Sequence, residues 1–175
     1  GYAYEKGNGV SQSFNKAMSW YRMAAESDLA EANHNIGMLY FNGYGVERIY
    51  TEAARWFTRA AKKELADSQF MIGRLYHEGL GVPPDSKKAL QWYTKAAKQG
   101  YVKAQFLTSY ILLSDDAGGS YPYQARVWAE LAKIHGYKDA DLMIQYCEFK
   151  LEEFQIEKAK LTAKNCLSSG YKDCF

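Results

Sequence analysis

Few residues in this sequence could do chemistry, and their spacing matches no catalytic or metal-binding pattern. His34, His77 and His135 are the only histidines, and they form neither an HExxH pair nor a Cys/His cluster with zinc spacing. No nucleophile elbow accompanies them. Glu152 and Glu153 are adjacent, so on a helix they would point about 100° apart and would not face one substrate. The sequence therefore predicts no enzyme, no catalytic residue, no metal and no cofactor.

Glycine-rich strings and one acidic turn are the other features that could bind a ligand. The strings are Gly7-Asn8-Gly9, Gly43-Tyr44-Gly45 and Gly79-Leu80-Gly81. They lack the preceding strand and the lysine of a phosphate-binding loop, and their recurrence favours structural turns. Asp115 and Asp116 lack the alternating oxygens and the closing glutamate of a calcium loop. We interpret that segment as a solvated turn.

A repeat of 36 residues organises the chain and must position every side chain in it. The four tryptophans, Trp20, Trp56, Trp92 and Trp128, follow one another at this spacing, as do columns of glycine, alanine and tyrosine. Apolar residues recur at helical spacing within about 31–41 and again within about 50–62, with glycines between the two segments. The pattern predicts an all-α fold, a right-handed superhelix (solenoid) of helix-turn-helix repeats.

The repeat also divides the chain. We expect a single domain over 1–175, with a truncated first repeat at 1–30, repeats at 31–66, 67–102 and 103–138, and a degenerate C-terminal cap at 139–175. Because Gly1 falls inside a repeat, we expect the natural protein to begin upstream. Trp56 lies in an interior repeat, so we expect its ring to be nearly buried.

The repeat string resembles a known family. Gly73-Arg-Leu-Tyr76, Gly79-Leu-Gly-Val82 and Ala89-Leu-Gln-Trp-Tyr-Thr-Lys-Ala-Ala97 are similar to the sel-1-like repeat, a longer relative of the tetratricopeptide repeat. This resemblance implies an adaptor that binds protein partners. It covers essentially the whole chain and is specific for fold, but it does not specify function. The fifth unit departs from the pattern, because a two-residue deletion shortens it, so that Gly170 follows Gly136 by 34 residues, and Thr162 stands in place of the tryptophan.

Three in-phase columns on the first helices have unusual side chains for a solvated face. They are His34, Phe70 and Phe106; Met38, Arg74 and Tyr110; and Phe41, His77 and Leu113. Aromatic residues, Met and Arg are enriched at the cores of protein interfaces. We predict that eight of these nine residues, all except Leu113, line one concave partner-binding strip. An alternative of equal weight is that these columns pack neighbouring first helices together.

The cysteines predict a disulfide. Small residues eight positions apart recur at each junction between repeats, for example Ala60 and Ser68, and the pair in phase with them in the last unit is Cys166 and Cys174. Close Cβ atoms at such a junction suit a disulfide, and the spacing also resembles bridges in cysteine-rich members of the family. Cys147 falls in an apolar column, so we expect a buried free thiol. Because cytosolic thiols usually stay reduced, a bridge favours a periplasmic or secreted location.

Composition restricts the partner. The net charge of +2 gives no footprint for nucleic acid, and no apolar run is long enough to span a membrane. We expect a bacterial envelope adaptor that binds a protein partner through its concave groove. Two alternatives stay open, both from resemblance alone: a periplasmic immunity protein that sequesters a secreted antibacterial toxin, and a cell-wall or β-lactam hydrolase.

Overall fold

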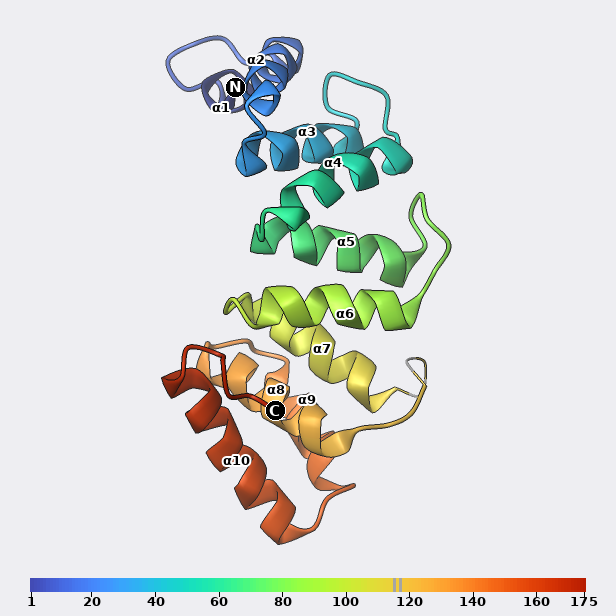
Figure 1. Ribbon diagram of the computed structural model, residues 1–175, viewed down its shortest axis with the longest axis vertical. Helices are drawn as coiled ribbons and strands as arrows, with labels where there is room; N and C mark the ends of the chain where they lie inside the picture. The colour runs from blue at the N-terminus through green and yellow to red at the C-terminus, as the bar shows by residue number, and fades with distance from the viewer. Residues whose placement is uncertain (115, 117) are drawn as a thin grey trace. The chain divides into compact units, whose positions relative to one another are not determined.

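The computed structural model describes residues 1–114, 116 and 118–175, and in this part of the chain all regular structure is helical (Figure 1). Asp115, half of the acidic pair noted above, lies outside the described residues. The first helices of the repeats are α1 (Tyr2–Lys6), α3 (Ala30–Asn42), α5 (Ala66–Glu78), α7 (Val102–Leu113) and α9 (Ala140–Glu148). The second helices are α2 (Phe14–Glu26), α4 (Tyr50–Lys62), α6 (Ser86–Ala97), α8 (Pro122–Ile134) and α10 (Glu153–Ser168). The predicted all-α repeat fold is confirmed.

The helices form two compact units, residues 1–85 with α1–α5 and residues 86–175 with α6–α10. In the first unit and from α6 to α9 in the second, consecutive helices pack on one another, whereas α10 packs on α8. The assignment of the whole chain to one domain stays a prediction.

In the first unit, a glycine on the first helix lets an aromatic ring of the second helix pack against its backbone. A Cβ atom added to Gly37 on α3 would lie 2.6 Å from Cε1 of Phe57 on α4, and Gly1 makes the same approach to Tyr21. Phe57 is fully buried and Tyr21 nearly so. No larger residue fits at position 37 while the ring of Phe57 keeps its place. The close contact brings the two helices of the repeat together.

The second unit has a complementary exchange at the corresponding positions. Ser109 on α7 is in phase with Gly37, and Ala129 on α8 is in phase with Phe57. Both are fully buried, and the Ser109 hydroxyl donates a hydrogen bond of 2.8 Å to the carbonyl of Ala125. The second unit thus has a larger first-helix residue and a smaller second-helix residue than the first unit at these two positions.

The expected burial of Trp56 is wrong. Its indole is half-buried, and the Arg59 guanidinium lies 4.6 Å from its ring centroid. The core-facing ring is that of the next residue, Phe57, because Ala53, Phe57 and Ala60 share one face of α4 at spacings of four and three. The 36-residue period identified equivalent positions but not which of two adjacent rings faces the core.

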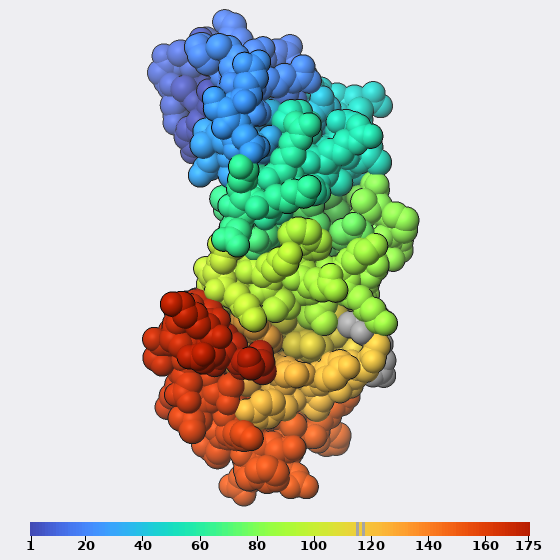
Figure 2. Space-filling model, viewed as in Figure 1, coloured from blue at the N-terminus to red at the C-terminus, as the bar shows by residue number. Residues whose placement is uncertain are grey.

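The C-terminal segment closes the second unit. Helix α10 packs on α8 and buries Ala159 and Ala163, and the tail lies at the surface of this unit (Figure 2). The Phe175 ring lies 5.9 Å from the ring of Trp128, which is buried, unlike the half-exposed Trp20 in the first unit.

The predicted disulfide is confirmed. Cys166 on α10 is bonded to Cys174 in the tail, with their Cα atoms 4.4 Å apart. Both residues are buried, so the bridge holds the tail against the end of α10. Cys147 on α9 is a buried free thiol, as predicted, and burial raises its pKa to about 12.

We expect Phe57→Ala to destabilise the first unit far more than Trp56→Ala. Removing the enclosed ring of Phe57 should cost about 3–5 kcal/mol. Removing the half-buried indole of Trp56 should cost about 1–2 kcal/mol. Urea unfolding followed by circular dichroism measures both, and equal losses would contradict the assignment of Phe57 as the core ring.

We expect reduction of the disulfide to lower the free energy of unfolding of the second unit by about 2.5 kcal/mol, because the unfolded chain regains the entropy of the closed loop. The check is urea unfolding with and without a reducing agent. The Cys166→Ala, Cys174→Ala double variant is the control, since its stability should not respond to the reductant. A wild-type stability that reductant leaves unchanged would refute this role.

Candidate functional site

The first unit brings the predicted column residues of α3 and α5 into contact. His34 Nδ1 lies 2.8 Å from the hydroxyl of Ser68, and the His34 ring lies 5.4 Å from that of Phe57. The Arg74 guanidinium lies 5.0 Å from the ring centroid of Phe41, a cation–π geometry. His34, Phe41 and Arg74 therefore pack neighbouring first helices together in this unit, in line with one of the two interpretations of the sequence.

Burial separates the column residues of the first unit into two groups. Phe70 and Phe41 are buried, so a partner could reach little of either ring. Met38, Arg74 and His77 are half-exposed and can contact a partner. Arg74 also forms an ion pair of 2.7 Å with Glu78, one turn further along α5, so its charge is partly neutralised.

The second unit presents a groove between α7 and α9. Its volume is about 250 Å³, and Tyr110, Leu113, Ser114, Met143 and Tyr146 line it. Two column residues line this groove: Leu113 is buried in the wall of the groove, whereas Tyr110 is 44% exposed.

Phe106, one turn before Tyr110 in α7, is half-buried and stacks on Tyr137 at a centroid distance of 4.6 Å. Burial raises the pKa of the Tyr137 hydroxyl, so this pair adds no charge to the surface near physiological pH.

Three residues that continue the columns were missed in the sequence. Leu142, Tyr146 and Phe149 follow Phe106, Tyr110 and Leu113 by the same 36 residues. They are 64%, 55% and 92% exposed, more open to solvent than any of the eight predicted residues. The period itself could have found them, because the deletion in the fifth repeat comes after this helix. They extend the apolar surface of the second unit onto α9.

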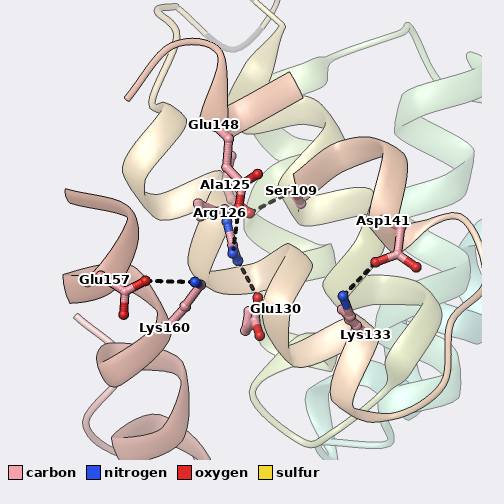
Figure 3. Close-up of polar contacts among 9 residues, drawn as sticks. All are labelled: Ser109, Ala125, Arg126, Glu130, Lys133, Asp141, Glu148, Glu157 and Lys160. Carbon is pink, nitrogen blue, oxygen red and sulfur yellow. Dashed lines mark hydrogen bonds and ion pairs between the residues drawn. The ribbon is translucent and has the colours of Figure 1, made fainter. Parts of the chain in front are cut away.

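A buried arginine holds α9 in place. Arg126 on α8 is almost fully buried and forms ion pairs with Glu130 on its own helix and, at 3.2 Å, with Glu148 at the end of α9 (Figure 3). The in-phase residues of the earlier repeats, Met18, Ala54 and Leu90, carry no charge. Losing either carboxylate would leave a buried cation only partly compensated, which is costly. The ion pair thus fixes the end of α9, where Tyr146 and Phe149 lie.

The described residues contain neither a metal-ligand cluster nor a membrane-spanning helix. Among the described residues, no group of three or more histidine, cysteine or acidic side chains could hold a metal ion. None of the helices described is both long and apolar enough to cross a bilayer. The eight predicted residues lie on both units, so their forming one continuous strip stays a prediction.

Comparison with known proteins identifies the repeat. The Sel1 repeat model matches residues 1–29, 30–65 and 66–101. The chain belongs to the Sel1 repeat family. The second and third matched repeats begin one residue earlier than those expected from the sequence. Sel1 repeats are generally protein-interaction modules and non-enzymatic scaffolds.

Solved structures agree with this family assignment. A Sel1 repeat protein from Oxalobacter formigenes is 27% identical, with a TM-score of 0.79 over 98% of this chain and 70% of that one. The protein c5321, a protective antigen present in uropathogenic Escherichia coli strains that displays an SLR fold, is 30% identical, with a TM-score of 0.84. That match covers 97% of this chain but only 38% of c5321. No match was found among curated proteins.

We expect His34 to make the first unit less stable in acid. Burial lowers the pKa of the imidazole from its ordinary value of 6.5, and the nearby carboxylates of Asp67 and Glu5 offset this only in part. Below pH 6.5 the unfolded chain takes up a proton that the folded chain does not, so stability is complete above that pH and falls below it. Urea unfolding at pH 7.5 and 5.0 should show a smaller pH effect for His34→Gln than for the wild type. Equal pH effects would contradict this assignment.

Proposed function

We propose that this protein binds a partner protein through the first-helix surface of its second unit. The observation that carries the proposal is a set of exposed side chains on and next to α7 and α9: Tyr110 and Tyr146, which line the groove, with Leu142 and Phe149 one turn to either side of Tyr146. Large apolar groups that a fold leaves exposed together are typical of interaction sites. Tyrosine and phenylalanine bury much area for little lost side-chain entropy, so they suit a binding surface.

The surface is pre-organised by contacts beneath it. Arg126 and Glu148 fix the end of α9, and the buried Cys147 anchors the helix between Tyr146 and Glu148. A surface that does not have to be ordered on binding loses less conformational entropy. The half-exposed Met38, Arg74 and His77 of the first unit are a second set of candidate contacts.

We place the protein in the bacterial envelope or outside the cell. The disulfide between Cys166 and Cys174 supports this location, because such bridges persist in oxidising compartments. Both solved relatives named above come from bacteria. An envelope protein and a secreted toxin are the two partner classes that this compartment supplies.

The test compares protein capture by matched variants. The tagged wild type should retain a partner from native envelope extract, and the Tyr146→Ala, Phe149→Ser double variant should lose it, because the central apolar contacts are gone. Leu161→Ser is the control, since Leu161 is an exposed apolar residue of α10 outside the groove. Arg74→Ala should weaken capture less than the double variant, because its charge is already shared with Glu78.

Mass spectrometry identifies the retained protein, and titration calorimetry with that protein gives the affinities. Circular dichroism must show that each variant is folded. Undiminished capture by the folded double variant would contradict the proposed surface.

A further inference from the structure

A second recess, chemically unlike the first-helix surface, lies in the first unit between α4 and α5. Its volume is about 460 Å³, and none of the column residues lines it. Its walls are Thr51, Ala54, Arg55, Thr58, Arg59 and Lys62 of α4, with Ile72, Leu75, Tyr76, Gly81 and Val82 of α5 and the loop that follows. We call this recess the basic pocket.

The rim of the basic pocket is positively charged. Arg55, Arg59 and Lys62 lie on one face of α4 at spacings of four and three, and all three are exposed. Arg55 shares its charge with Glu52 at 2.7 Å. Among the described residues, Arg59 and Lys62 have no ion pair within 4.0 Å. Two of the three cations are therefore available to a ligand.

The carboxylate of Asp28 senses the charge of Arg59 but is paired with another cation. Asp28 accepts an ion pair of 2.5 Å from Lys63, and that contact lowers its pKa below the ordinary value. The Arg59 charge lowers the pKa of Asp28 further, but by a smaller amount. Asp28 is already paired with Lys63, so an anion at the pocket would meet a surplus of positive charge.

The floor of the basic pocket is apolar. Its accessible apolar lining is Ala54 on α4 and Val82 in the loop, both half-exposed, whereas Ile72 and Leu75 are almost fully buried. The Thr58 hydroxyl donates to the Ala54 carbonyl at 2.7 Å, so its proton is used within α4. A ligand that fits this recess carries negative charge at its edges and an apolar group between them.

The positive rim and the apolar lining of the basic pocket favour some classes of partner over others. A nucleic acid base would need an open aromatic face for stacking, and the Arg59 guanidinium covers the face of Trp56 at 4.6 Å. A membrane surface would need apolar side chains that protrude into the lipid, whereas Ile72 and Leu75 are recessed. Arginine pairs well with the planar carboxylates of a peptide.

We propose that the basic pocket binds a peptide segment of a partner protein in which acidic side chains flank an apolar one. The carboxylates contact Arg59 and Lys62, and the apolar side chain lies over the half-exposed Ala54 and Val82. This contact does not depend on the groove between α7 and α9, so the two surfaces can be tested independently.

The experiment uses fluorescence polarisation with a labelled peptide of sequence Glu-Glu-Leu-Glu-Glu-Leu. The wild-type protein should bind it, and binding should weaken as salt is raised. Arg59→Ala and Lys62→Ala should each weaken it about three- to fivefold, as expected for exposed charge pairs. The Arg59→Glu, Lys62→Glu double variant should show no binding.

Control peptides and variants separate charge from apolar contact. A peptide with glutamine for each glutamate and a polyglutamate without leucine should both bind more weakly. Lys164→Ala on α10 removes an exposed cation far along the chain and should not change the affinity. Tyr146→Ala should not change it either, even if it abolishes partner capture at the groove.

Several results would overturn the proposal. These are absence of peptide binding by the wild type, equal affinity for the glutamine peptide, or an unchanged affinity in the folded double variant. Tighter binding of a DNA duplex or of phosphatidylglycerol vesicles, lost in the same variant, would assign the pocket to a nucleic acid or a membrane instead. Self-association abolished by Arg59→Glu would assign it to a second copy of this chain.

Discussion

The approach of the Phe57 ring to the backbone of Gly37 is the contact on which the first unit depends. It brings α3 and α4 close together and determines which face of each helix is enclosed. Once that face is fixed, helical geometry leaves Met38 on the open side of α3 and Arg59 on the open side of α4. The binding surfaces are therefore a consequence of the core, because the same contact that buries one face presents the other.

The second unit modifies this plan at its end. Helix α10 and the disulfide-bonded tail cover α8, which encloses Trp128, while α9 is held at its end by the ion pair between Arg126 and Glu148. The covering segment leaves Tyr146 and Phe149 exposed. A departure from the repeat thus has two effects: it closes the core of the unit, and it leaves an apolar helix face available to a partner.

Much of the fold follows from sequence periodicity, since the 36-residue step predicts the helices and the glycine turns. The Cys166–Cys174 pair follows from the same repeat once its last unit is shortened by two residues, because these cysteines follow Ala132 and Ala140 by 34 residues. What periodicity does not determine is the rotation of each helix. Trp56 recurs more strictly than Phe57, whose position holds Ala129 in a later repeat, yet the packing against Gly37 encloses Phe57. Phe70 could not be separated from the exposed column residues for the same reason. The basic pocket depends on two helices meeting, and no pattern within either one predicts it.

The most direct test of the central contact is a double-mutant cycle that transfers the Ser109–Ala129 pair of the second unit to positions 37 and 57. Gly37→Ser should cost about 1–3 kcal/mol through overpacking, and Phe57→Ala about 3–5 kcal/mol through the cavity it leaves. In the double variant the serine side chain occupies space that the ring has left. Urea unfolding should then give a loss smaller than the sum of the single losses by more than about 1 kcal/mol. Losses that add to within about 0.5 kcal/mol would show that the two positions do not interact and would contradict this account of the fold.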